Sequence, residues 1–125
     1  MASNAEAVRE LWAHFAAGEY RRALPLLAPS FRARWVVTRE ILPTPEAFIR
    51  VQEEYPGSGR IRLDRLIDDG ETIVTIALVD WAGEAHFETV SEWTFTDDGL
   101  IAGVTEWWPD ESEPPAGREH LTERY

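Results

Sequence analysis

The first apolar residues of the chain recur at helical spacing. Ser3 and Glu6 form an S-x-x-E capping box, and Gly18 is a natural residue to follow a helix C-terminus. Between them the apolar positions lie three and four residues apart: Val8, Leu11, Trp12 and Phe15. This pattern predicts a first amphipathic helix that ends near Gly18.

Two further helical patterns and one strand pattern follow. Residues 20–27 predict a short second helix, which Pro25 shortens or distorts. Residues 31–38 read as a first strand. Thr44 as N-cap and Pro45 at the first helical position predict a third helix, which ends at the Pro-Gly-Ser-Gly segment.

From residue 60 onward the hydrophobic period changes to two. Turn signals at Asp68-Asp69-Gly70, Ala82-Gly83 and Asp97-Asp98-Gly99 divide this part into four strand-like runs. The runs cover residues 60–68, 72–82, 84–96 and 99–108. Because turns this short join antiparallel neighbours, the pattern predicts a meander.

Three N-terminal helices packed on a strongly curved antiparallel β-sheet make an α+β fold. A long, bent sheet wrapped on helices leaves a cone, and its open end is a natural ligand pocket. Residues 1–109 are predicted to form this domain. Residues 110–125 are an acidic, proline-containing tail that packs on the domain or extends from it.

Composition removes several classes of chemistry. Among 125 residues there are 12 basic side chains, all of them arginine, and 23 acidic ones, which gives a net charge of −11. The absence of cysteine and lysine excludes disulfides, thiolate nucleophiles, Schiff bases and a P-loop lysine. The acidic balance argues against a nucleic-acid partner. No run is apolar enough for a membrane helix, so a cytoplasmic protein is expected.

The order of elements, the ALPLLAPSF segment after Gly18 and the stretch DWAGEAHFETVSEWTFTDDGLIAGVTEWWPD resemble the NTF2-like superfamily. This cone-shaped fold is shared by nuclear transport factor 2, ketosteroid isomerases and SnoaL-type cyclases. The resemblance covers nearly the whole chain to about residue 109. It implies the fold more strongly than a function, because the fold hosts isomerases, dehydratases, epoxide hydrolases and binding domains.

The resemblance does not carry the ketosteroid isomerase machinery. The oxyanion-hole tyrosine would fall on Leu11, the aspartate base on Trp35 and the protonated aspartate on Ser91. Leucine cannot donate a hydrogen bond, and tryptophan cannot accept a proton. We therefore expect a member of the superfamily without isomerase activity of that type.

The resemblance also implies which strand positions face the cone, although a slip of one residue would exchange all of them for their neighbours. The inward set is Thr75, Ala77, Val79, Phe87, Thr89, Ser91, Trp93, Val104, Glu106 and Trp108, and Trp35, Leu11 and Phe15 complete the wall.

Glu106 is the strongest catalytic candidate, because it is the only ionisable residue among the inward positions of the meander. A carboxylate among tryptophans is desolvated, which raises its pKa and suits it to acid or base chemistry near neutral pH. The alternative is a structural carboxylate at the mouth of the cone, paired with Arg34 or Arg39.

Ser91 and His14 are the secondary catalytic candidates. The Ser91 and Thr89 hydroxyls share the inward face and can orient a carbonyl group, or they can be satisfied by neighbouring backbone groups. His14 lies beside the apolar stripe of the first helix and can reach the pocket or simply pack at the surface. The three histidines lack metal-like spacing, so no metal and no cofactor are expected.

The predicted ligand-binding residues are Trp35, Thr89, Trp93, Val104, Trp108, Phe15, Leu11, Val79 and Phe87. The sequence thus predicts a domain that binds an apolar or aromatic small molecule, either as a binding protein or as a cofactor-independent lyase, isomerase or hydrolase. The alternative is a non-catalytic assembly domain whose cone is filled by tryptophans. A homodimer through the outer sheet face, around Val90 and Trp107, is expected by analogy with relatives.

Overall fold

A computed structural model describes residues 3–55, 59–81, 85–109 and 111–125 of the chain. The helical elements are α1 (Asn4–Ala16), the 3-10 helix η1 (Tyr20–Leu26) and α2 (Pro45–Glu54). The strands are β1 (Leu27–Trp35), β2 (Glu40–Leu42), β3 (Gly59–Asp68), β4 (Ile73–Trp81), β5 (Ala85–Phe95) and β6 (Ile101–Trp107).

The predicted helix boundaries follow from local capping chemistry. The Ser3 hydroxyl accepts a hydrogen bond from the Glu6 backbone N–H at 3.1 Å, and Gly18 takes a left-handed φ of 72° just after α1. Thr44 caps α2 through the Ala47 backbone N–H at 3.1 Å, with Pro45 in the first turn. The second helical pattern forms a short 3-10 helix that contains Pro25, so the expected distortion is observed.

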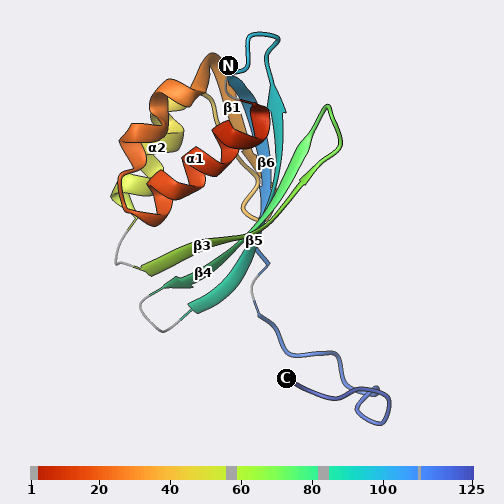
Figure 1. Ribbon diagram of the computed structural model, residues 1–125. Helices are drawn as coiled ribbons and strands as arrows, with labels where there is room; N and C mark the ends of the chain where they lie inside the picture. The colour runs from red at the N-terminus through yellow and green to blue at the C-terminus, as the bar shows by residue number, and fades with distance from the viewer. Residues whose placement is uncertain (1–2, 56–58, 82–84, 110) are drawn as a thin grey trace.

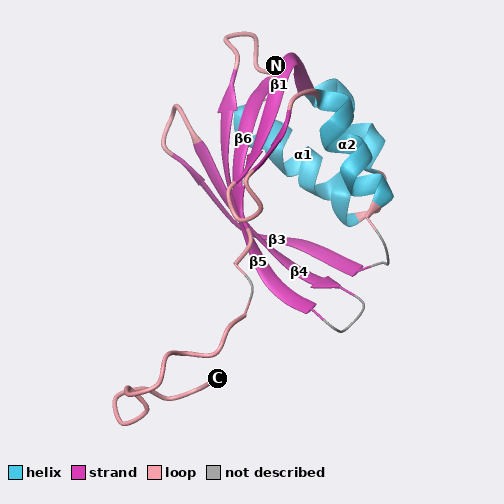
Figure 2. Ribbon diagram, turned by 180° about the vertical axis from the view of Figure 1, so that it is seen from behind, coloured by secondary structure: helices cyan, strands magenta, loops and turns pink. Residues whose placement is uncertain are grey.

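The six strands form one sheet in the order β2-β1-β6-β5-β4-β3. From β3 to β6 each strand pairs antiparallel with the next, which confirms the predicted meander. Figures 1 and 2 show α1 and α2 on one face of this sheet, which bends so that the ends of β3, β4 and β5 splay away from β1 and β6. The predicted α+β fold is therefore confirmed. The predicted loop at Gly57-Ser58 and the predicted turn at Ala82-Gly83 lie outside the described residues.

The N-terminal strand differs in detail from its prediction. β1 begins at Leu27 rather than at residue 31, and it pairs in parallel with β6. The strand accommodates Pro29 because its pairing with β6 shifts register between Leu27 and Arg32, and proline is tolerated at such irregularities. After Trp35 the chain turns back, with Arg39 at a φ of 59°, into the short strand β2, which the hydrophobic pattern does not reveal.

The core lies between the helices and the inward face of the sheet. α1 contributes Val8, Leu11, Trp12 and Phe15, and α2 contributes Phe48 and Ile49; all of them are buried. Burial alternates along β4 as the period-two pattern requires, with Ile73, Thr75 and Ala77 buried. The predicted inward parity is therefore the observed one.

Residues 111–125 contain neither helix nor strand and run away from the sheet (Figure 1). Within this segment Arg124 pairs with Glu113, with 3.1 Å between Nη1 and Oε2. Among the helices of the described residues, none is long and apolar enough to cross a membrane.

Candidate functional site

Glu106 lies on β6 between two other inward-facing strand residues. It is paired in register with Trp35 of β1 on one side and with Ser91 of β5 on the other. Cross-strand partners point to the same face of a sheet, so the three side chains meet beneath the helices. Only 5% of the Glu106 surface is exposed to solvent.

Both carboxyl oxygens of Glu106 are hydrogen-bonded. The Trp35 indole Nε1 donates to Oε1 at 3.0 Å, and the Ser91 hydroxyl donates to Oε2 at 2.6 Å. Ser91 is completely buried, so this second bond is shielded from water. The two donors fix the orientation of the carboxyl group, as a proton-transfer group requires.

Burial raises the pKa of Glu106, because desolvation penalises the carboxylate. The hydrogen bonds from Ser91 and Trp35 favour the charged form and offset part of this effect. In the described part of the chain no arginine forms an ion pair with Glu106. The predicted structural alternative, a pair with Arg34 or Arg39, is therefore wrong: both arginines are exposed, whereas Glu106 is buried on the inward face of the sheet.

A cavity of about 320 Å³ opens beside Glu106, between the helices and the splayed half of the sheet. Its lining is Trp12, Phe15, Tyr20, Trp35, Thr38, Glu40, Gln52, Tyr55, Ile61, Val79, Trp81, Phe87, Thr89, Glu106 and Trp108. The volume is at the small end of the range typical of ligand sites. The tryptophans of this region line the space without filling it.

Two aromatic corners shape the wall of the cavity. The Trp35 and Trp108 rings meet edge to face, with centroids 4.8 Å apart at 87°. The Tyr55 and Trp81 rings meet in the same way at 5.2 Å and 86°. Perpendicular contacts of this kind are favourable and hold each ring in place.

Beside the cavity, two buried tryptophans share one hydrogen-bond acceptor. Thr75 Oγ1 accepts a hydrogen bond from Trp12 Nε1 at 3.1 Å and another from Trp93 Nε1 at 2.8 Å. The two indole rings cross at 90°, with centroids 6.1 Å apart. Trp12 presents part of its ring to the cavity, whereas Trp93 is completely buried.

The structure brings seven of the predicted site residues into the cavity wall: Phe15, Trp35, Val79, Phe87, Thr89, Glu106 and Trp108. Leu11, Trp93 and Val104 belong instead to the closed core beneath it, because the helices cover this part of the sheet. Ser91 reaches the site only through its bond to Glu106.

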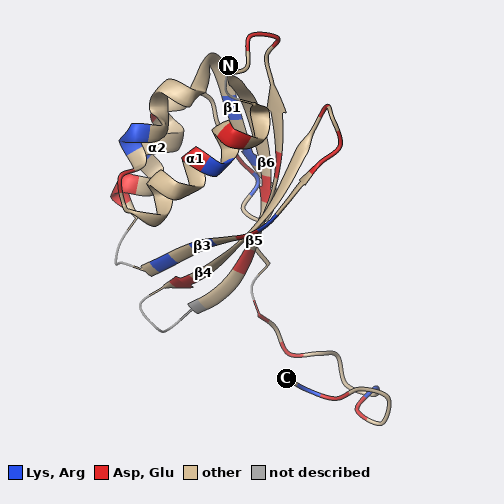
Figure 3. Cartoon of the chain, in the orientation of Figure 1, with Lys and Arg blue, Asp and Glu red and all other residues tan. Residues whose placement is uncertain are grey.

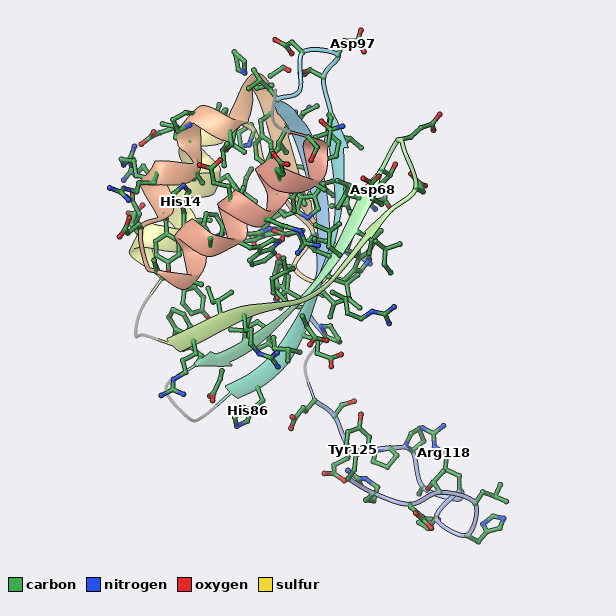
Figure 4. The ribbon with its side chains drawn as sticks, in the orientation of Figure 1. His14, Asp68, His86, Asp97, Arg118 and Tyr125 are labelled. Carbon is green, nitrogen blue, oxygen red and sulfur yellow. The ribbon has the colours of Figure 1, made fainter. Side chains whose placement is uncertain are left out.

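His14 is not in the cavity wall. It lies on α1 (Figure 4), and its Nε2 is 3.6 Å from Glu10 Oε1, one helical turn earlier. Its side chain is 21% exposed. Since His14 is adjacent to the apolar stripe rather than in it, the helix turns its ring toward the side of the bundle.

Sequence reasoning missed about half of the cavity lining. Ile61 pairs with Val79, and Trp81 lies two residues beyond Val79, so extending the period-two pattern along β4 and across to β3 would have found both. Gln52 and Tyr55 belong to the end of α2. No sequence pattern links that helix end to the cone.

The donor chemistry does not suggest a metal centre. Among the residues that the structure describes, no group of three or more histidine, aspartate or glutamate side chains could hold a metal ion. Glu106 is surrounded by aromatic rings and hydroxyl groups rather than by further ligands.

The comparisons with known proteins find similar solved structures but no matching family or curated protein. No protein-family model matches the chain. No curated protein matches it either. Solved structures do match, and a proposed ketosteroid isomerase from Kribbella flavida DSM 17836 is 29% identical, with a TM-score of 0.84 over 95% of this chain and 87% of that one.

Two further solved structures share the fold at lower identity. An NTF-2 like protein of unknown function from Burkholderia xenovorans LB400 is 19% identical, with a TM-score of 0.79 over 98% of this chain and 94% of that one. SalBIII, an epoxide hydrolase/cyclase-like enzyme in pyran ring formation in polyether salinomycin, is 14% identical, with a TM-score of 0.68 over 85% of this chain and 90% of that one. The helices on a bent sheet, the meander and these likenesses agree, and the chain has the NTF2-like fold.

Proposed function

We propose that the protein binds a small, largely apolar or aromatic molecule in the cavity and that Glu106 exchanges a proton with it. One observation carries this proposal: a buried carboxyl group, held by two hydrogen bonds and without a basic partner among the described residues, lies in the wall of an aromatic cavity. Structural carboxylates are usually paired with a cation or exposed to water, and Glu106 is neither.

The surroundings of Glu106 support acid or base chemistry without a cofactor. A raised pKa lets the carboxyl group hold its proton closer to neutral pH, and the same group accepts a proton once it is ionised. Thr89 and Gln52 supply polar atoms in the same wall, which can orient a ligand. A cofactor-independent lyase, isomerase or hydrolase would use this equipment.

The proposed reactive carboxyl group stands at a different position from those of ketosteroid isomerase. Trp35 and Ser91 stand where the resemblance puts the two aspartates of that enzyme, and both donate hydrogen bonds to Glu106. The carboxyl group that these two residues hold thus comes from β6. We therefore do not propose steroid isomerisation by that enzyme's machinery, and the neighbours' activities are not transferred to this chain.

The test uses 5-nitrobenzisoxazole, a neutral aromatic compound that reports a desolvated base. A carboxylate removes its C3 proton, the N–O bond breaks, and the electron pair leaves on the phenolate oxygen of the cyanonitrophenol product. We expect the wild type to catalyse this elimination roughly a hundredfold or more faster than Glu106→Gln does, because this is the usual contribution of a positioned base. The wild-type rate should rise with pH through the raised pKa of Glu106.

The matched control is Glu92→Gln. It makes the same charge change on β5, one residue from Ser91, but on the opposite and exposed face of the sheet. It should retain the wild-type rate. Equal rates in the wild type and Glu106→Gln would contradict the role of Glu106.

We also propose that the protein forms a homodimer through the outer face of the sheet. Ile76, Val90 and Trp107 are register partners across β4, β5 and β6, so they form one half-buried apolar stripe on the face opposite the helices. Figure 3 shows acidic residues on β4 and β5 and basic residues on β3, and charges of both signs allow a second copy to pack around the stripe.

Sedimentation velocity tests this assembly. Val90→Arg, which places a charge at the centre of the stripe, should convert a dimer to a monomer without changing the circular dichroism spectrum. A wild-type monomer, or a dimer that Val90→Arg leaves intact, would contradict it. The closed, tryptophan-filled alternative has less support, because the cavity beside Glu106 is open.

A further inference from the structure

The cavity lining is rich in aromatic rings, and its ionisable residues are acidic. Eight of its fifteen residues are aromatic, two are the carboxyl residues Glu40 and Glu106, and among the described residues of the lining none is arginine or histidine. All 12 basic residues of the chain are arginine, and those the structure describes lie outside this wall. An anionic ligand would therefore meet aromatic faces and carboxyl groups without a counter-charge.

The aromatic walls have the geometry that favours a cation. The face of an indole ring carries negative potential, and tryptophan attracts ammonium groups more strongly than tyrosine or phenylalanine does. Trp35 and Trp108 meet at 87°, so they enclose a corner with two walls, and Glu106 contacts the same corner through Trp35. The Trp35 N–H bond to the carboxyl group makes the indole ring more electron-rich, which strengthens this attraction.

The net charge of the chain acts in the same direction. At −11 the protein as a whole attracts cations and repels anions over distances beyond a single contact. The buried Glu106 carboxyl accepts two hydrogen bonds but has no cationic partner among the residues that the structure describes, so a positively charged ligand group would supply one. Burial keeps such a pair away from solvent screening.

We infer that the ligand of this cavity carries an organic ammonium group, tertiary or quaternary, seated against Glu106 and the Trp35–Trp108 corner. This inference rests on the proposed function and narrows its ligand class. A tertiary amine that enters uncharged takes the proton of Glu106 on its nitrogen and forms an ammonium–carboxylate pair. A quaternary ammonium group has no site for that proton, so its binding releases the proton to water.

The test compares two probes of the same shape, phenyltrimethylammonium and its uncharged carbon analogue tert-butylbenzene. Binding is followed by the indole N–H signal of Trp35 in proton–nitrogen NMR spectra. We expect the cation to bind the wild type about tenfold more tightly than the neutral probe. Glu106→Gln should lose most of this preference and keep its affinity for tert-butylbenzene, whereas Glu92→Gln should behave as the wild type.

Calorimetry in two buffers of different ionisation enthalpy counts the protons released. Phenyltrimethylammonium should release up to one proton from the wild type at pH values below the pKa of Glu106, and none from Glu106→Gln.

Equal binding of the two probes, or tighter binding of tert-butylbenzene, would overturn the ammonium inference and leave the cavity as a ligand site. Failure of both probes to bind would overturn the proposed function as well. Binding of the cation without loss in Glu106→Gln would also refute the inference, because the charge preference would then come from elsewhere. Glu106→Gln and Glu92→Gln make the same chemical change, the first at a buried site and the second at an exposed one, so a loss confined to Glu106→Gln is not a general charge effect.

Discussion

Replacing Thr75 by valine should destabilise the protein strongly, although the two side chains have nearly the same shape. Thr75 Oγ1 accepts hydrogen bonds from two buried indole groups, Trp12 at 3.1 Å and Trp93 at 2.8 Å. Valine retains the packing and removes the shared acceptor. Two buried N–H donors would then lack a partner.

The expected cost follows from those two donors. Each buried polar group left unsatisfied costs about 1 to 3 kcal/mol, so Thr75→Val should lower the free energy of unfolding by about 2 to 6 kcal/mol. That is a large part of the stability of a typical small domain. Thr75→Ser is the matched control, because it retains the hydroxyl group and loses one methyl group, worth about 1 kcal/mol.

Urea unfolding followed by circular dichroism measures both variants. Thr75→Val should move the midpoint to much lower urea with an unchanged slope, and Thr75→Ser should move it only slightly. A Thr75→Val variant within about 1 kcal/mol of the wild type would refute the assignment of both indole bonds to one hydroxyl. So would a Thr75→Ser variant less stable than Thr75→Val.

Three further predictions concern the site and its support. Because burial raises the pKa of Glu106 above its ordinary 4.5, the folded state holds this proton more tightly than the unfolded state. The resulting stability is fully present below pH 4.5 and is lost as the pH rises through the raised pKa. Glu106→Gln should remove this pH-dependent loss when thermal unfolding is measured across pH. Trp35→Phe removes a donor to the carboxylate, so the pKa of Glu106 should rise further in a carbon-13 NMR titration, and an unchanged or lower pKa would contradict the bond. Arg21→Ala breaks the exposed ion pairs with Glu46 and Glu53 that join η1 to α2. The Tm should fall only slightly, and by less at high salt, because exposed pairs are weak and screened. A large loss that does not depend on salt would show that these pairs do not behave as exposed ones.

The parts of the fold that depend on local chemistry could be predicted from the sequence. Helix caps at Ser3 and Thr44 use hydrogen bonds within three residues, and the alternation along β4 and β5 sets which side chains face inward. The strand β2 has only three residues, too few to show a period. The parallel pairing of β1 with β6 joins segments about 70 residues apart, which no local pattern encodes.

The site was predictable in its central residue but not in its partners. Glu106 stood out because it was the only ionisable position on the inward face of the meander. Its bond to Trp35 depends on the register between β1 and β6, and its lack of an arginine partner depends on Arg34 having the opposite parity. The depth to which α1 covers the sheet decides that Trp93 belongs to the core while Trp108 lines the cavity.

The central claim is that Glu106 is a buried carboxyl group whose proton a ligand can exchange. A carbon-13 NMR titration of the glutamate carboxyl groups, with the Glu106 signal assigned from its absence in Glu106→Gln, tests this most directly. The structure predicts that the pKa of Glu106 lies above the ordinary 4.5 and falls when phenyltrimethylammonium is added. A pKa at or below 4.5 in the free protein would contradict the account.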